Sequence, residues 1–297
     1  MNCNNGVNNR TIPLGQINQK GDREYNKKDL PFSKKVSIIV SMVALIARNY
    51  FVCLPSIIRD GVKCAKERSR AGEKFKDGYQ VSCSSPTGEI KDLPLFCIHG
   101  WKGRGTDFNS YAENLLASGY KGKIYQIDVP KNRKLSTKKE ADTVEKCIEK
   151  VMEKEENKRI NIVGHSRGGL VAFQLGVNKV LEIQKIITLA SPLYGTAMTV
   201  FDSFSVKDLG FYSETLKYLR TEIKKQKIEL FHAGNKFDTM IVPGESSAIL
   251  EGTDNDHKFL YHGRHRIVLH SVYPGDKEIA GKCVEWLQSI VKLPKQD

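Results

Sequence analysis

The segment that most constrains the fold lies near the middle of the chain, where an apolar run passes directly into a helical pattern. Residues 160–163 read Ile-Asn-Ile-Val, and the letters GHSRG follow at 164–168, before Gly169 and Leu170. A short β-branched run bounded by glycines predicts a strand, and the pattern after it predicts a helix. The two glycines that flank Ser166 leave room for a sharp turn. We therefore expect Ser166 at a strand-to-helix turn.

A serine at such a turn has a chemical consequence. The pattern G-x-S-x-G between a strand and a helix presents the hydroxyl to a base from a strained backbone, as a nucleophilic serine requires. The helix N-terminus after Ser166 points backbone N–H groups to the place where negative charge develops during attack on a carbonyl. The competing interpretation is a glycine-rich turn without chemistry. The strand before the motif and the helix after it favour Ser166 as a nucleophile.

From about residue 90 the chain alternates short β-branched runs with helical patterns. Strands are predicted over residues 95–98, 123–127, 160–163, 185–189, 228–231 and 266–269, and helices over 108–118, 137–155, 170–177, 214–225 and 276–291. Strands separated by helices predict right-handed β-α-β units. The predicted fold class is α/β, a mostly parallel twisted sheet with helices on both faces, in a domain over residues 73–297. Thr137 and Glu140 have the spacing of a capping box, at the start of a helix whose charged face is expected to be solvated.

The N-terminal part of the chain has a different composition. Residues 1–35 are rich in Asn, Gln, Gly and Lys and lack apolar periodicity, so they are predicted to be a disordered leader. Residues 36–58 form an apolar segment that Arg48 interrupts, and its uninterrupted part is shorter than the roughly 20 residues of a spanning helix. Two interpretations stay open: membrane association through residues 36–54, and a helix packed on the domain. The protein is accordingly expected to be either membrane-associated or cytoplasmic.

Composition excludes several other classes of function. The formal net charge of +13 comes from 47 Lys and Arg against 34 Asp and Glu. These basic residues are spread along the chain and form no nucleic-acid module, so no nucleic-acid partner is expected. The seven cysteines are irregularly spaced without a CxxC pair, which favours free thiols in a reducing compartment over a disulfide scaffold or a zinc site. Neither a metal nor a cofactor is predicted.

A second strand end lies upstream of the serine. The apolar run at 94–98 ends at His99, Gly100 and Trp101. A tetrahedral intermediate carries a full negative charge on the former carbonyl oxygen, so two backbone donors near Ser166 are needed. We expect them to be the N–H groups of Trp101 and Arg167. His99 is expected to bond the loop backbone and shape the turn, and no proton transfer is assigned to it.

Together these segments resemble the lipase and esterase branch of the α/β-hydrolase superfamily, in particular bacterial-type triacylglycerol lipases. The resemblance covers roughly residues 92–292 and rests on 96–128, on 164–169 and on 186–196, where IITLASPLYGT is similar to a T-L-x-S-P-x-x-G-T stretch of lipases. It implies a triad in the chain order Ser, then Asp or Glu, then His. Arg167 departs from the pattern, because many members carry a neutral residue there. This cation is expected either to favour an anionic substrate or to bond a neighbouring loop.

The acid of the implied triad is expected to follow a strand late in the chain. Asp238 comes after the apolar run at 228–231 and a short turn, which matches that place. An aspartate there would hold the imidazole in the correct tautomer and stabilise its protonated form. Asp254 and Asp256 are alternatives, but they lie in a polar stretch without a preceding predicted strand.

The base is less sharply defined, because four histidines lie downstream of Asp238: His257, His262, His265 and His270. His270 is favoured because it follows the predicted strand at 266–269 and precedes the terminal helix. The glycine that usually precedes the catalytic histidine is absent, since Leu269 stands there. His265 therefore stays open as a competing base.

The resemblance implies a carboxylic ester hydrolase acting on lipid-like esters through an acyl-enzyme. A thioesterase or an acyltransferase could use the same triad and is the alternative. A non-catalytic scaffold is disfavoured by the presence of all three residue types in order. Between residues 195 and 227, apolar side chains either form a lid and acyl pocket or belong to the core. They are Met198, Val200, Phe201, Phe204, Phe211 and Tyr212.

Overall fold

The fold is known from a computed structural model. It describes residues 80–101, 103–129, 135–196, 199, 207–211, 213–235, 238, 240–241, 244–247, 256–260 and 270–289, and three two-residue strands, β1 (Gln16–Ile17), β2 (Arg23–Glu24) and β3 (Glu73–Lys74). The apolar segment 36–58 and the predicted strand at 266–269 lie outside the described residues, as does the leader apart from β1 and β2. No helix in the described part of the chain is long and apolar enough to span a bilayer.

Within the described residues, eight strands form one sheet in the order β10-β9-β8-β7-β5-β6-β4-β3. The new strands are β4 (Gln80–Ser84), β5 (Leu95–Ile98), β6 (Ile124–Asp128), β7 (Arg159–His165), β8 (Glu182–Leu189), β9 (Glu229–Gly234) and β10 (Asp256–Leu260). The strands from β10 to β6 run parallel, and β4 and β3 continue the sheet antiparallel. The predicted α/β class with a mostly parallel sheet is confirmed.

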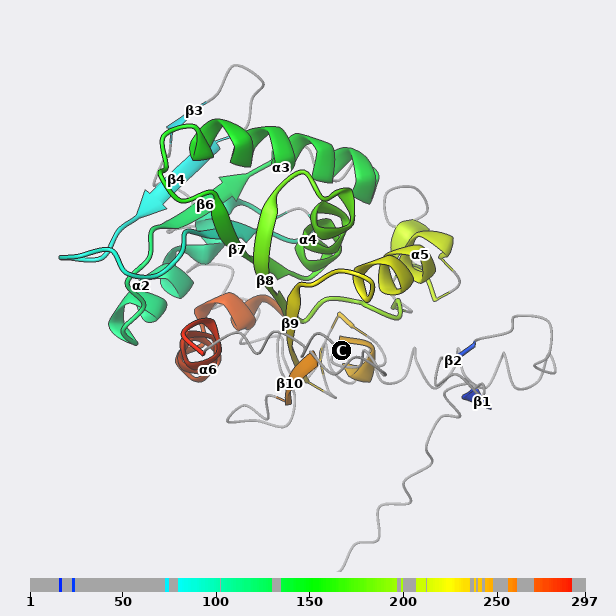
Figure 1. The fold of residues 1–297 in the computed structure, drawn as a ribbon. Helices are drawn as coiled ribbons and strands as arrows, with labels where there is room; N and C mark the ends of the chain where they lie inside the picture. Colours follow the sequence, from blue (N-terminus) through cyan, green and yellow to red (C-terminus); the bar gives the residue numbers. More distant parts are fainter. Residues whose placement is uncertain are drawn as a thin grey trace, which may run out of the picture.

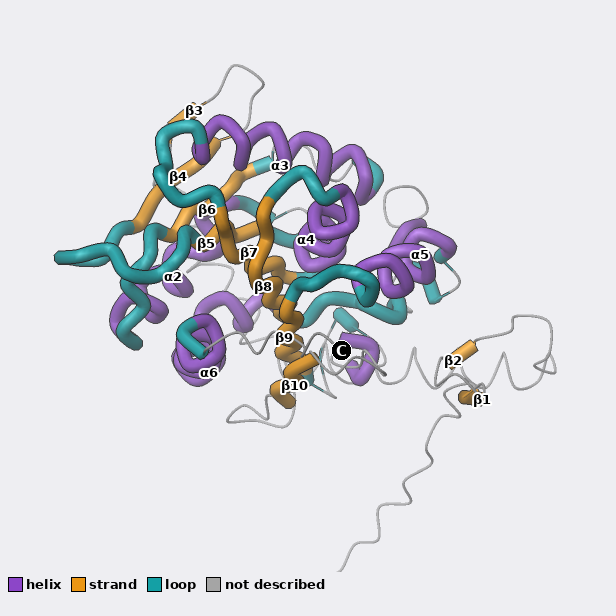
Figure 2. The backbone as a smooth tube through the Cα atoms, viewed as in Figure 1, coloured by secondary structure: helices purple, strands orange, loops and turns teal. Residues whose placement is uncertain are grey.

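Helices cover both faces of this sheet, as Figures 1 and 2 show. They are α2 (Asn109–Ala117), α3 (Thr137–Met152), α4 (Arg167–Asn178), α5 (Glu214–Ile223) and α6 (Lys277–Leu287), with 3-10 turns η1 (Gly105–Phe108), η4 (Lys207–Leu209), η5 (Gly244–Ser247) and η6 (His270–Gly275). Helices α3, α4 and α5 lie on one face, and α2 and α6 on the other.

The core follows from the alternation of side chains along the central strands. In β5, Phe96 and Ile98 join the cluster under α3 and α4, whereas Leu95 and Cys97 join the cluster under α2 and α6. All four side chains are fully buried. A strand covered on both faces must be apolar at every position, which is why its sequence is an unbroken hydrophobic run. Because the strands from β10 to β6 run parallel, their carboxyl ends meet at one edge of the sheet.

One expectation about local structure is wrong, and one strand was not predicted. The N-cap of α3 is Ser136, whose hydroxyl accepts the N–H of Lys139 at 3.3 Å, so the capping box assigned to Thr137 and Glu140 does not exist. Glu140 is fully buried. The structure also contains a strand that the sequence did not predict, β10, which begins at Asp256 and pairs in parallel with β9. Backbone pairing at the sheet edge stabilises this strand in spite of its polar sequence.

Candidate active site

Ser166 lies at the turn between β7 and α4, at the carboxyl edge of the sheet. Its φ is 55° and its ψ is −124°, and it is the N-cap of α4. A positive φ at a residue with a side chain costs on the order of 1–3 kcal/mol and persists only where the surroundings impose it. Here the Ser166 N–H donates to the carbonyl of Leu189 at 2.8 Å, so β8 holds the turn from the side. The predicted sharp turn is present.

Glycines allow the helix to approach the strand this closely. A Cβ built on Gly164 would lie 2.4 Å from the backbone of Gly168, and one on Gly168 would lie 2.2 Å from the carbonyl oxygen of Ile98. Real Cβ atoms do not come within 3.0 Å of such atoms. Neither position of the motif can therefore carry a side chain without moving α4 away from β5 and β7.

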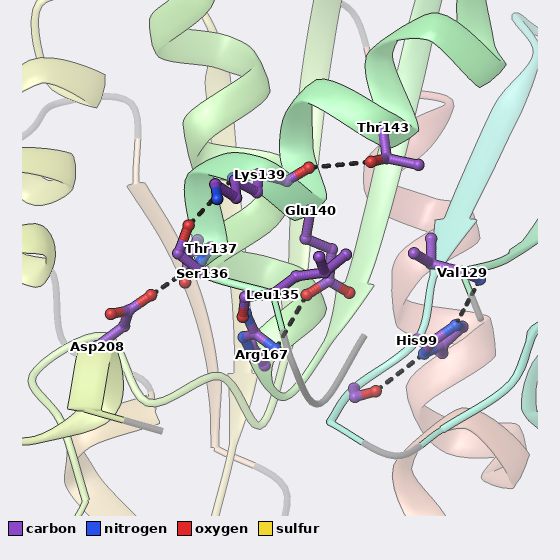
Figure 3. Close-up of polar contacts among 11 residues, drawn as sticks. His99, Val129, Leu135, Ser136, Thr137, Lys139, Glu140, Thr143, Arg167 and Asp208 are labelled. Atoms are coloured by element: carbon purple, nitrogen blue, oxygen red, sulfur yellow. Dashed lines mark hydrogen bonds and ion pairs between the residues drawn. The ribbon is translucent and has the colours of Figure 1, made fainter. Parts of the chain in front are cut away.

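The turn after β5 lies against the serine. A Cβ on Gly100 would lie 2.9 Å from the Cβ of Ser166 and 3.4 Å from its Oγ. Buried His99 holds this turn, since its Nδ1 lies 2.8 Å from the Gly100 carbonyl and its Nε2 accepts the N–H of Val129 at 3.0 Å (Figure 3). A backbone N–H can only donate, so Nε2 of His99 carries no hydrogen and Nδ1 carries the proton. His99 thus shapes the turn, as expected.

Arg167, the first residue of α4, directs its side chain away from solvent. Its NH1 lies 3.1 Å from Oε2 of Glu140, and its NH2 donates to the carbonyl of Leu135 (Figure 3). Of the two roles considered for this cation, the bond to a neighbouring loop is the one observed. Arg167 follows Ser166 and Trp101 follows Gly100, so the two residues expected to supply oxyanion donors lie on the two segments that meet at the serine.

Asp238 and His270 are in direct contact although 32 residues separate them. Nδ1 of His270 lies 3.1 Å from Oδ1 and 3.0 Å from Oδ2 of Asp238, whose side chain is buried. Oδ1 also accepts the N–H groups of Met240 at 2.7 Å and Ile241 at 2.8 Å, which fixes the carboxylate. A carboxylate accepts, so Nδ1 carries the proton and Nε2 of a neutral His270 is left as an acceptor.

Sequence reasoning missed one further residue of this site. His165, at the last position of β7, lies with Nε2 2.8 Å from the main-chain oxygen of His270, and the two ring centroids are 4.7 Å apart. One feature of the sequence could have indicated His165. It occupies the variable position before Ser166 in G-x-S-x-G and has a side chain that can donate a hydrogen bond. The contact brings His270 to the residue adjacent to Ser166.

Several other expected site residues are not described. Asp254, His262 and His265 lie outside the described residues, as do Met198, Val200, Phe201, Phe204 and Tyr212 of the expected lid. The backbone of Phe211 packs on Gly195, where a Cβ would lie 2.7 Å from the Phe211 Cα. In the part of the chain that the structure describes, no group of three His, Cys, Asp or Glu residues could hold a metal ion.

Known proteins resemble this chain in two ways. A family model described as a PGAP1-like alpha/beta domain matches residues 130–265. The mature lipase BlEst2 of Bacillus licheniformis superposes with a TM-score of 0.56 at 13% identity, covering 71% of this chain and 98% of that one. A monoacylglycerol lipase of Paleococcus ferrophilus gives a TM-score of 0.53 at 14% identity, covering 70% of this chain and 98% of that one. The chain has an α/β-hydrolase fold.

Another solved structure shares the α/β-hydrolase fold. Lipase B of Aspergillus fumigatus gives a TM-score of 0.55 at 14% identity, covering 71% of this chain and 57% of that one. At these identities the likeness concerns the fold, and a search of curated proteins found no match. In α/β hydrolases the nucleophile follows a central strand, and an acid and a histidine follow it in that chain order. Ser166 after β7, Asp238 after β9 and His270 after β10 have this order.

Proposed function

We propose that the protein is a serine hydrolase that cleaves carboxylic esters of lipid-like acids, with Ser166, His270 and Asp238 as its triad. The observation that carries the proposal is the pair of contacts that His270 makes. Its Nδ1 is bonded to both oxygens of Asp238, and its main chain is bonded to the residue next to Ser166. A histidine so oriented has its unprotonated nitrogen at Nε2, which can take a proton from a serine hydroxyl.

The reaction proceeds in two steps. Ser166 Oγ attacks the ester carbonyl carbon while its proton passes to Nε2 of His270, and Asp238 stabilises the imidazolium that forms. The tetrahedral intermediate collapses when the carbon–oxygen bond to the alcohol breaks, and His270 protonates the departing alcohol. Water then attacks the acyl-enzyme with His270 as base, which releases the acid and restores Ser166.

The backbone N–H groups of Trp101 and Arg167 supply the oxyanion hole in this proposal. The close approach of Gly100 to Ser166 supports the first donor, because Trp101 directly follows Gly100. The helix start at Arg167 supports the second, since the first N–H groups of a helix point towards its N-terminal end, where Ser166 lies. One such donor contributes about 2.7–4 kcal/mol to comparable reactions.

The substrate class rests on the fold neighbours and on the apolar segment of the chain. Two of the neighbours are described as a lipase and a monoacylglycerol lipase. Membrane association through residues 36–54 would bring the site to such substrates, and it remains part of the proposal. A thioesterase or an acyltransferase would use the same serine and histidine, so the test must vary the substrate as well as the residues.

The test is covalent labelling by a fluorophosphonate probe, which reacts with activated serines. Labelling is expected in the unmodified protein and should be lost in Ser166→Ala and His270→Ala. His265→Ala is the matched histidine control and should still be labelled. Turnover of p-nitrophenyl esters of increasing chain length, against the matching thioesters, then identifies the acyl group and the leaving group. A folded, unmodified protein that takes no label would indicate a non-catalytic scaffold and contradict the proposal.

A further inference from the structure

His165 occupies the position before the proposed nucleophile, yet its side chain contacts the proposed base. Its Nε2 lies 2.8 Å from the main-chain carbonyl oxygen of His270. A carbonyl oxygen only accepts, so Nε2 of His165 carries a proton and donates it to this bond. The two rings are tilted by 37° with centroids 4.7 Å apart, so they also pack on each other.

The protonation state of His165 suits a supporting role. Burial lowers the pKa of His165 well below its usual value, and the neighbouring His270 and His99 lower it further, while the bond to the His270 carbonyl acts in the opposite direction. His165 is therefore neutral near pH 7, with its single proton on Nε2. A neutral ring places no positive charge beside the His270 imidazolium that forms during the reaction.

His270 is thereby held at two separate points. Asp238 binds its ring at Nδ1, and His165 binds its main chain. The ring of Tyr273 packs edge-on to His270 at 6.3 Å and lies 6.4 Å from the ring of His165. Asp238 alone fixes which nitrogen faces the serine, but rotation of the whole residue about that contact would still move Nε2. The bond to the main chain removes this freedom.

We propose that His165 is a positioning residue, which through its Nε2–H bond to the His270 carbonyl sets the location of the base relative to Ser166. The inference rests on the proposed function, because it requires Ser166 and His270 to react together. His165 is covalently joined to Ser166, so any shift of the turn moves the nucleophile and the anchor of the base together. A misplacement of about 1 Å between reacting groups can lower a rate on the order of 100-fold.

The test separates the hydrogen bond from the packing of the ring. His165→Phe keeps a flat ring and loses the donor, whereas His165→Gln loses the ring and keeps an N–H donor. His232→Asn is the control: His232 is a fully buried histidine of the sheet, bonded to Thr188 Oγ1 at 2.7 Å and assigned no part in the reaction. For each variant, kcat and KM for p-nitrophenyl butyrate and the rate of fluorophosphonate labelling are measured, with circular dichroism to establish folding.

His165→Phe is expected to lower kcat and the labelling rate by about 10- to 100-fold with KM within twofold, because the base is displaced but the substrate still binds. His165→Gln should recover most of the loss, and His232→Asn should keep the kcat of the unmodified protein. If His165→Phe does not fold, His165→Met replaces it as the variant without a donor.

The proposal would be overturned if folded His165→Phe, or His165→Met in its place, had a kcat within twofold of that of the unmodified protein. An equal loss in His165→Gln would overturn it as well, since the ring and not the bond would then matter. Failure of the proposed function looks different, because the unmodified protein itself would take no label.

Discussion

Glu140 and Arg167 form a buried ion pair behind the nucleophile turn, with Oε2 and NH1 3.1 Å apart and both side chains excluded from solvent. Figure 3 shows the pair between the first turns of α3 and α4, with the carbonyl of Leu135 on the same guanidinium. Arg167 immediately follows Ser166. The pair therefore connects the start of α3 to the turn that carries the serine, and it holds in place the residue proposed to supply one oxyanion donor.

Glu140→Leu is expected to lower the free energy of unfolding by about 3–5 kcal/mol, because it leaves the Arg167 charge buried without a carboxylate. Urea unfolding measures the loss. Glu149→Gln, an exposed change on the same helix, is the control and should stay within about 0.5 kcal/mol of the unmodified protein.

The combination of Glu140→Leu with Arg167→Met removes both charges and should recover most of that stability. The backbone N–H of residue 167 remains, so kcat of the folded double variant should be close to that of the unmodified protein. Equal destabilisation by the single and the double variant would mean that the pair is not the source of the effect.

Gly100→Ala is expected to damage the site more than the fold. The new methyl group would lie 2.9 Å from the Cβ of Ser166, so the turn that carries the proposed donor of Trp101 must move. Loss of one oxyanion donor lowers kcat on the order of 100- to 1,000-fold, and a decrease of that size is expected here. Ester hydrolysis and thermal unfolding of the variant are the measurements.

Gly281→Ala is the matched control for this change. Gly281 lies in α6, and a Cβ there would meet no atom within 4 Å. Alanine should stabilise the helix by up to about 1 kcal/mol without altering kcat. If Gly100→Ala retained full activity, the turn after β5 would have no part in binding the oxyanion.

Asp238→Asn tests the orientation of the base. An asparagine can keep the two bonds from the N–H groups of Met240 and Ile241 through its oxygen, which turns its NH₂ towards Nδ1 of His270. The imidazole must then carry its proton on Nε2, where it cannot accept one from Ser166. We expect kcat to fall on the order of 10,000-fold in a folded protein.

The control for this amide substitution is Asp208→Asn. Asp208 accepts the N–H of Thr137 at 2.8 Å, and an asparagine oxygen can replace that acceptor. Its kcat should match that of the unmodified protein, measured with the same ester. A decrease of less than tenfold in Asp238→Asn would point to another residue as the acid.

The features that the sequence predicted are those set by local pattern. The run before Ser166 is mostly apolar because β7 is buried on both faces, and the glycines around Ser166 have to lack side chains because α4 approaches β5 and β7 so closely. Chain order and the neighbouring predicted elements then favoured Asp238 and His270, with His265 left open as the base, and the structure brings the side chains of Asp238 and His270 together.

The features that the sequence did not predict depend on contacts between distant segments. Glu140 has the spacing of a capping residue, and only the position of Arg167 across the helix interface makes it a buried partner. Strand β10 is polar in sequence and is stabilised by backbone pairing with β9. His165 occupies a variable position of the G-x-S-x-G motif, and its role depends on a contact with His270, which lies 105 residues later in the chain. Periodicity within one segment carries no information about such partners.

The lowered pKa of His165 predicts an acid-sensitive contribution to stability. Its pKa in the folded protein lies well below that of the unfolded chain, for which about 6.5 is usual. As pH falls below 6.5, the His165 ring takes up a proton in the unfolded state but not in the folded state, so the free energy of unfolding decreases. The decrease from this group can reach about 1.4 kcal/mol per pH unit until the folded pKa is passed.

Urea unfolding at pH 7, 6 and 5 measures this contribution. His165→Gln removes the titrating ring, so its free energy of unfolding should fall less steeply between pH 6.5 and 5 than that of the unmodified protein. Gly281→Ala leaves every titratable group in place and should keep the original slope. Because all other groups are common to the two proteins, equal slopes for His165→Gln and the unmodified protein would show that His165 takes up its proton as readily in the folded state as in the unfolded chain. The ring would then be charged at mildly acidic pH and would place a positive charge beside His270, against the neutral ring inferred for His165.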